Sequence, residues 1–185
     1  MTLPNQITIG RILLIPVFVV LAIYYGRTSA AGHPDETLRI ATIGVFLLAA
    51  LSDGVDGWLA RRYGGNSVGA ILDPVADKAL LVTMYVTLAA VNQLPDWLAI
   101  LVVFRDLVIV GGVIVLAVLG DPVLIRPLFI SKVNTLLQIM LVGVVMLQAG
   151  FGLSLWGVEP GLIWLVAAST FASGGAYVWV TARGR

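Results

Sequence analysis

The sequence predicts an all-α integral membrane protein with about six transmembrane helices in one bundle. Hydrophobic residues make up 59% of the 185-residue chain and charged residues only 11%, whereas soluble domains carry about 25% charged residues. The apolar residues also form long runs, several of them close to the roughly 20 residues that cross a bilayer as a helix. Basic and acidic residues nearly balance, with 11 and 10 respectively, so bulk charge gives no support for a nucleic-acid partner.

The first expected span is Ile7–Tyr25. Its apolar run has no basic segment before it and no small-residue cleavage site after it, which indicates a retained helix rather than a signal peptide. The other five expected spans are Leu38–Trp58, Pro74–Val91, Trp97–Leu119, Ser131–Ala149 and Gly161–Thr181. The segments between the spans are rich in glycine, proline and polar residues. No long linker and no internal repeat divides the chain, so we expect one membrane domain over residues 1–185.

The basic residues predict how the bundle is oriented. If both termini lie on one side, the opposite loops receive only Arg27 and Arg39. Arg105 lies inside a span, and the terminal side receives the other eight basic residues: Arg11, Arg61, Arg62, Lys78, Arg126, Lys132, Arg183 and Arg185. Because loops rich in lysine and arginine stay in the cytoplasm, both termini are expected to be cytoplasmic. A short chain without a transit-like leader favours a bacterial plasma membrane.

Four carboxylates gather at the predicted cytoplasmic ends of the second and third spans. Asp53, Asp56, Asp73 and Asp77 lie within 25 positions, and spacings of three and four place each pair on one helix face. Like charges at the edge of a bilayer are costly without a compensating cation. The chain has no cysteine and one histidine, His33, so oxygen ligands favour Mg²⁺, Mn²⁺ or Ca²⁺ over zinc. Two such ions would suit a pyrophosphate group.

Small residues and an arginine accompany these acids. Gly57 and Ala60 follow the first pair on the same helix, and Gly69 precedes the second. Small side chains let helices pack closely and leave room for a nucleotide, and Arg61 is suited to bidentate phosphate recognition. The alternative is that the acids simply pair with basic residues. It is less favoured, because four acids occur at these spacings together with the small residues and the arginine.

The pattern resembles the signature of the CDP-alcohol phosphatidyltransferases, D-x-x-D-G-x-x-A-R followed by G-x-x-x-D-x-x-x-D. Matching positions are Asp53, Asp56, Gly57, Ala60, Arg61, Gly69, Asp73 and Asp77. The spacer of seven residues between Arg61 and Gly69 is shorter than is usual in the family, which leaves the geometry of this turn open. Residues 4–8, with Asn5, and Arg11 resemble the opening of the same proteins.

This resemblance implies a six-helix fold, a homodimer and a site open to the cytoplasmic leaflet. It implies that Asp53, Asp56, Asp73 and Asp77 bind two divalent ions, Mg²⁺ or Mn²⁺, and that Asp77 also deprotonates the acceptor hydroxyl. That oxygen would attack the β-phosphorus of CDP-diacylglycerol, and CMP would leave. Further donor-binding residues implied by the resemblance are Asn5, Arg11, Gly57, Ala60, Arg61 and Gly69.

The second half of the chain carries the candidate acceptor site. Arg105 and Asp106 lie inside an apolar span, where ionisable residues mark function or lock helices together. Lys132 and Thr135 share one face of the fifth span, with Gln138 a turn further, and would suit an acceptor phosphate. Lys132 could instead extend to the membrane interface as an anchor.

Asn134 is the residue on which the choice of acceptor depends. Phosphatidylglycerophosphate synthases tend to have a second lysine at this position, suited to glycerol 3-phosphate. The stretch around Asn134, together with the Arg105-Asp106 pair, resembles eukaryotic-type cardiolipin synthases, whose acceptor is phosphatidylglycerol. We therefore predict acceptor binding by Lys132, Thr135, Arg105 and Asn134, with phosphatidylglycerol favoured over glycerol 3-phosphate. A membrane transporter with an acidic ion site is the alternative from another class.

Overall fold

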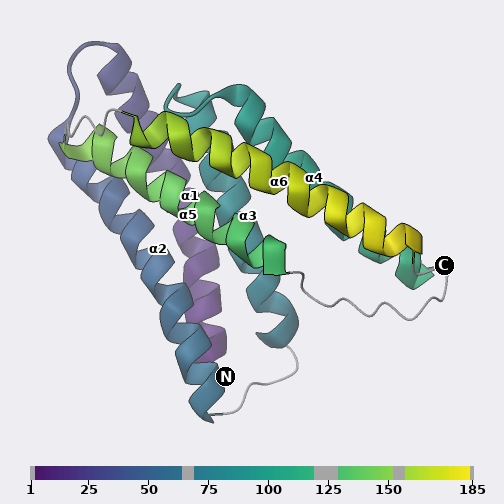
Figure 1. The fold of residues 1–185 in the computed structure, drawn as a ribbon. Helices are drawn as coiled ribbons and strands as arrows, with labels where there is room; N and C mark the ends of the chain where they lie inside the picture. Colours follow the sequence, from purple (N-terminus) through teal and green to yellow (C-terminus); the bar gives the residue numbers. More distant parts are fainter. Residues whose placement is uncertain (1–2, 64–68, 119–128, 152–156, 184–185) are drawn as a thin grey trace.

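The computed structural model describes residues 3–63, 69–118, 129–151 and 157–183, and the side chains of residues 9–52, 76–112, 129–148 and 157–179. This part of the chain forms six α-helices and no strand (Figure 1). Their bounds are α1 Leu3–Ala30, α2 Glu36–Tyr63, α3 Gly69–Ala90, α4 Asp96–Val118, α5 Phe129–Phe151 and α6 Val158–Arg183.

Each predicted span lies inside one of these helices, apart from its last residue in two cases. Val91 lies one residue beyond the end of α3, and Leu119 lies outside the described residues. The all-helical prediction is therefore confirmed. Among the described residues, three stretches are long and apolar enough to cross a membrane: Ile9–Ala30, Phe129–Gln148 and Val158–Trp179. Several helices run beyond their predicted spans, and α2 is five residues longer than the predicted Leu38–Trp58 at its end. The predicted spans include only the apolar residues that match the thickness of the bilayer core. The helices are longer because their backbone hydrogen bonding continues into the membrane interface.

Helix α3 packs against three of the other five helices. Helix α3 contacts α1, α4 and α5, while α1 also packs on α2, and α6 packs on α4 and α5. Met84, Tyr85 and Leu88 of α3 are almost completely buried. Close packing of α1 against the end of α3 depends on Gly26, where an added Cβ would lie only 2.6 Å from Cγ1 of Val91. In Figure 1, α2 and α6 start near each other and then diverge, α2 toward the N-terminus of the chain and α6 toward its C-terminus.

Two short turns connect helices at the other end of the bundle. Helix α2 is capped by Asp35, whose Oδ1 accepts hydrogen bonds from the backbone N–H groups of Thr37 and Leu38 at 2.8 and 3.2 Å. A side chain of this type satisfies the free N–H groups of a first turn. Asn92 lies in the turn after α3, and its positive φ of 58° is one that asparagine tolerates better than most residues. These caps allow α1–α2 and α3–α4 to turn back tightly.

Polar and apolar side chains are distributed as a membrane environment requires. Large apolar side chains are exposed on the outer faces of all six helices, for example Leu13, Leu48, Val86, Phe104, Phe129 and Trp164. Buried polar side chains include Arg11, Arg105, Asp106, Asn134, Gln138, Thr170 and Ser173. Lipid solvates the apolar exterior, and polar groups at this depth turn inward to find partners. The fold thus gathers its chemistry inside the bundle.

Candidate active site

Arg11 connects the two helices that carry the predicted acidic motif. Its side chain is only 1% exposed, although it lies in the apolar helix α1. The guanidinium donates one hydrogen bond to Asp77 Oδ1 of α3 and another, at 3.4 Å, to Ser52 Oγ of α2. Ser52 directly precedes Asp53 in the sequence. Arg11 therefore brings the start of the first acidic pair close to the end of the second.

Asp77 borders a cavity between α2, α3 and α5. The cavity has a volume of about 100 Å³, and Asp77 and Thr135 are its polar lining residues. The other lining residues are apolar: Phe46, Ala49, Ala50, Leu80, Leu81, Met84 and Ile139. The Asp77 side chain is 37% exposed, so its carboxylate is accessible as well as paired. A general base needs this combination of a fixed position and access.

The rest of the acidic motif is placed by its backbone alone. Asp53 and Asp56 lie in α2, and Asp73 lies in α3 four residues before Asp77. Their side chains lie outside the described residues, as do those of Asn5, Gly57, Ala60, Arg61 and Gly69. Among the side chains that the structure describes, no group of three or more potential ligands is close enough to hold a metal. Helix direction and the Arg11 bridge nonetheless place the four acids at one end of the bundle.

A second charged group lies beside the first and joins α3 to α4. Lys78, the residue after Asp77, pairs with Oδ1 of Asp106. The same oxygen accepts a hydrogen bond of 2.6 Å from Nη1 of Arg105. Nη2 of Arg105 donates to Ser131 Oγ of α5 at 2.7 Å and also to Ser173 Oγ of α6. Arg105 thus connects its own helix α4 to α5 and α6 from a position only 4% exposed.

Helix α5 divides the predicted acceptor residues between two faces. Lys132 is exposed in its first turn, and Thr135 lines the Asp77 cavity. Asn134 and Gln138 are buried on the adjacent face. Asn134 Oδ1 accepts hydrogen bonds from Ser169 Oγ at 2.8 Å and from Thr170 Oγ1 at 2.9 Å, both of α6. The structure therefore places Thr135 next to Asp77, and Asn134 in contact with α6.

Several partners in these networks were not anticipated from the sequence. Ser52, Ser131 and Ser173 are the hydroxyl partners of the two buried arginines. Their signal is weak, because isolated serines are common in membrane helices. Stronger signals were available for the ion pairs, since Arg11 and Lys78 both lie within helices where a charge needs a counter-charge.

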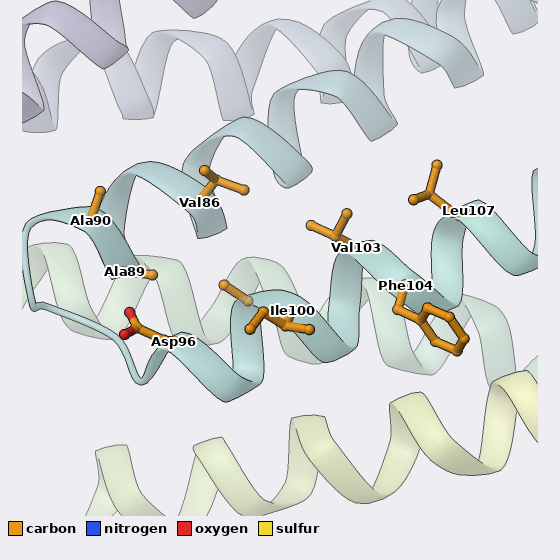
Figure 2. A pocket seen from close by; sticks show the side chains of 9 residues that line it. Val86, Ala89, Ala90, Asp96, Ile100, Val103, Phe104 and Leu107 are labelled. Atoms are coloured by element: carbon orange, nitrogen blue, oxygen red, sulfur yellow. The ribbon is translucent and has the colours of Figure 1, made fainter.

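A separate groove lies between α3 and α4. Figure 2 shows it lined by Val86, Ala89 and Ala90 of α3 and by a row of α4 side chains that begins at Asp96. Its volume is about 540 Å³. Ile100, Phe104 and Leu107 are largely exposed along this groove. None of the predicted site residues lines it, and apart from Asp96 its lining offers no charged side chain.

Comparison with known proteins identifies relatives of the whole helical region. The profile of the CDP-alcohol phosphatidyltransferase family matches residues 1–172. The chain is 36% identical to a chloroplastic CDP-diacylglycerol–glycerol-3-phosphate 3-phosphatidyltransferase of rice, with 94% of this chain and 55% of the relative covered. It is 31% identical to the Bacillus subtilis protein with that activity in its name, covering 95% of this chain and 92% of the relative.

Another relative bears the name of a different activity. The chain is 34% identical to human cardiolipin synthase (CMP-forming), over 76% of this chain and 48% of the human protein. The chain thus spans about half the length of the rice and human relatives and nearly all of the bacterial one. The relatives share a type of transfer reaction in their names and differ in the acceptor.

Proposed function

Since the chain belongs to the CDP-alcohol phosphatidyltransferase family, we propose that it transfers a phosphatidyl group from CDP-diacylglycerol to an alcohol and releases CMP. The observation that carries this proposal is the Arg11 bridge, which connects Ser52, next to Asp53, with Asp77. In the reaction, the acceptor oxygen bonds to the β-phosphorus while the bond from that phosphorus to the CMP oxygen breaks. Asp77 takes the hydroxyl proton. The family match favours this enzyme over a transporter with an acidic ion site.

The carboxylates fit a hard divalent cation. Asp77 lies accessible at the edge of its cavity, and three more acids lie at the same end of α2 and α3. We propose that Asp53, Asp56, Asp73 and Asp77 hold two ions, Mg²⁺ or Mn²⁺. When bound, such ions neutralise charge on the attacked phosphorus and on the leaving phosphate. The carboxylates contribute oxygen ligands and a fixed spacing, and Arg11 holds Asp77 in place.

The donor is proposed to lie across the ends of α1, α2 and α3. Gly57, Ala60 and Gly69 lack large side chains, which leaves the helix backbones open to a nucleotide. Arg61 and Arg11 would contact phosphate oxygens, and Asn5 the nucleotide. Arg11 is supported most directly, because its side chain already reaches both acidic helices.

For the acceptor we propose phosphatidylglycerol, which makes the chain a cardiolipin synthase. The support is chemical: the cavity beside Asp77 and Thr135 is lined mainly by apolar side chains, which suit a lipid better than a small polyol phosphate. Lys132 is exposed in the first turn of α5, the helix that carries Thr135, and would contact the phosphate group of the acceptor. Asn134, on the adjacent face of α5, and Arg105 of α4 complete the proposed acceptor set.

Glycerol 3-phosphate is the second candidate acceptor, which would make the chain a phosphatidylglycerophosphate synthase. The Bacillus subtilis relative, of which 92% is covered, has transfer to glycerol 3-phosphate in its name. The two candidates share the donor and the base.

At the level of the whole chain, we propose one membrane domain over residues 1–185 that crosses the bilayer six times and forms a homodimer. Both termini and the acidic ends of α2 and α3 would face the cytoplasm of a bacterial cell. The distribution of basic residues and the apolar exterior support this arrangement. Membrane lipids are then its solvent as well as its substrates.

A direct assay tests the proposal. Purified protein in nanodiscs is supplied with CDP-dioleoylglycerol and Mn²⁺ or Mg²⁺, and released CMP is measured with phosphatidylglycerol or glycerol 3-phosphate as acceptor. We expect metal-dependent CMP release, faster with phosphatidylglycerol, and its loss when EDTA is added. Absence of CMP release with every acceptor would refute the enzyme assignment. Faster release with glycerol 3-phosphate would select the second candidate.

A further inference from the structure

The groove between α3 and α4 has the form of a binding site for a lipid chain. The α4 residues that line it are spaced three or four apart, so they share one helix face. They are Asp96, Ala99, Ile100, Val103, Phe104 and Leu107. Ala89 and Ala99 are almost completely buried, whereas Ile100 and Phe104 are 67% and 63% exposed. Small side chains between large ones leave a channel of about 540 Å³ on the outside of the bundle (Figure 2).

The length of this groove matches one leaflet of a bilayer. Its ends on α4, Asp96 and Leu107, are eleven residues apart, which corresponds to about 17 Å along a helix. One leaflet of the hydrocarbon core is about 15 Å thick. Trp97, the residue after Asp96, lies against Trp164 of α6 with 5.6 Å between ring centroids, and tryptophans concentrate at the membrane interface. The groove therefore runs from the headgroup region at Asp96 to the middle of the bilayer.

The headgroup end of the groove is acidic. Asp96 also lines a second hollow of about 350 Å³, together with Glu159 in the first turn of α6 and the amides of Asn92 and Gln93. Among the described residues, neither carboxylate forms an ion pair. Negative charge is favourable in the first turn of a helix, which accounts for the position of each acid but supplies no counter-ion.

The two arginines at this end of the bundle have partners within their own helices. Arg39 pairs with Glu36 of α2 at 3.7 Å, and the guanidinium of Arg27 lies 5.9 Å from the ring centroid of Tyr24 in α1. Neither helix lines the groove. The groove end therefore attracts a cation and repels an anionic headgroup. An ammonium group offers three N–H donors that carboxylate and amide oxygens accept.

We propose that the groove between α3 and α4 binds a phospholipid with a primary-amine headgroup. Its acyl chain lies along α4, and its ammonium group lies at Asp96 and Glu159. The amides of Asn92 and Gln93 supply donors for its phosphate. This lipid occupies the leaflet opposite the acidic motif of α2 and α3, so it is a bound membrane lipid and neither donor nor acceptor in the proposed reaction.

Photo-crosslinking tests which lipid occupies the groove. The protein is placed in nanodiscs that contain phosphatidylethanolamine or phosphatidylcholine, each with the same diazirine-bearing acyl chain, and labelled peptides are identified by mass spectrometry. Phosphatidylcholine is the matched lipid because its trimethylated nitrogen has no N–H donor. We expect phosphatidylethanolamine to label Ile100–Leu107 of α4 at least about threefold more than phosphatidylcholine does, the effect of one exposed charge interaction.

Variants separate the headgroup contact from the apolar channel. Asp96→Asn should reduce labelling by phosphatidylethanolamine to the level of phosphatidylcholine, and Glu159→Gln provides a second test if Asp96→Asn does not fold. Glu36→Gln removes an exposed carboxylate at the same end of the bundle but outside the groove, and should keep the wild-type ratio. Ala90→Phe should fill the groove and reduce labelling by both lipids. Ala168→Phe, on the exposed surface of α6, should not.

Three results would overturn the proposed site. Equal labelling by the two lipids, or an unchanged ratio in Asp96→Asn, would exclude recognition of the amine. Absence of labelling by either lipid would exclude a lipid occupant. The chain has no native cysteine, so a disulfide-linked dimer formed on oxidation of Ile100→Cys would then identify a second copy of the chain as the occupant. Since these measurements do not require CMP release, their outcome is independent of the enzyme assay.

Discussion

Arg11 and Asp77 carry opposite charges on two different helices, and their contact defines the chemistry of this protein at the scale of single residues. Arg11 is buried in α1, and the partly exposed Asp77 carboxylate accepts its hydrogen bond next to a cavity. An arginine in this position holds the carboxylate in one orientation at the edge of the cavity. The pair is therefore suited to position a base that must also remain accessible.

Replacing Asp77 by asparagine tests its role as the base. The amide has nearly the same shape but neither accepts a proton nor ligates a cation strongly, so Asp77→Asn should lower CMP release by about 10²–10⁴-fold, the contribution of a positioned base. Glu36→Gln, at the exposed start of α2, removes a carboxylate at the opposite end and should leave the rate within about twofold. Near-normal turnover in Asp77→Asn would assign the proton transfer to another group.

Asp106 is predicted to matter for stability, because two cations depend on it. Asp106→Asn leaves the buried Arg105 and the partly exposed Lys78 without their shared carboxylate, and should lower the free energy of unfolding by about 3 kcal/mol. Asp96→Asn, at the exposed start of α4, is the matched control and should change it by less than about 1 kcal/mol. Chemical denaturation of the purified protein measures both. Equal stabilities would mean that the network is solvated or compensated elsewhere.

Much of the site was predictable from the sequence, because a charge in an apolar helix is a strong signal. Arg105 was singled out in this way, whereas Asp77 was singled out by its spacing in the acidic cluster, Arg11 by the family resemblance and Lys132 by the polar face at the start of the fifth span. The rotation of α5 was not predictable. Its apolar residues surround the helix, since lipid solvates the outside and packing fills the inside, so no single apolar stripe defines its inward face. For this reason the split between Thr135 and Asn134 appears only in the structure.

At the scale of secondary-structure elements, α5 separates two environments and gives each a different chemistry. One face, with Thr135 and Ile139, closes the apolar cavity beside Asp77. The adjacent face, with Asn134 and Gln138, meets the hydroxyls of α6. A lipid acceptor has both an apolar and a polar part, and the two faces of α5 correspond to these parts. Glycerol 3-phosphate would need the polar face alone.

Filling the cavity should therefore distinguish the two acceptors. Ala50→Leu places a larger side chain in the cavity that Ala50 lines from α2. We expect CMP release with phosphatidylglycerol to fall by about tenfold, and release with glycerol 3-phosphate to stay within about threefold, because only the lipid has an apolar part to displace. Ala168→Leu, on the exposed surface of α6, is the control and should change neither rate. An equal loss with both acceptors would assign the cavity to the shared donor instead.

At the scale of the whole molecule, the fold was predictable because long apolar runs and their polar connections fix the number and position of helices. Which helices pack against each other is less directly predictable from the sequence. Helix α1 lies against both acidic helices and supplies the arginine between them, whereas the sequence predicted only that the four carboxylates gather at the ends of the second and third spans. Close contacts such as that of Gly26 with Val91 determine this arrangement, and small residues are too frequent in membrane helices to indicate which pairs meet.

The orientation of the bundle is the remaining prediction at this scale, and the absence of native cysteine makes it directly testable. His33→Cys lies in the turn between α1 and α2, and Phe129→Cys lies at the start of α5 at a side chain 81% exposed. If the acidic end is cytoplasmic, a membrane-impermeant maleimide added to intact spheroplasts should label His33→Cys and not Phe129→Cys. Lysis should then expose Phe129→Cys to the same reagent. The reverse pattern would place the acidic end outside the cell, where a nucleotide-linked donor is not supplied, and would contradict the orientation inferred from the basic residues.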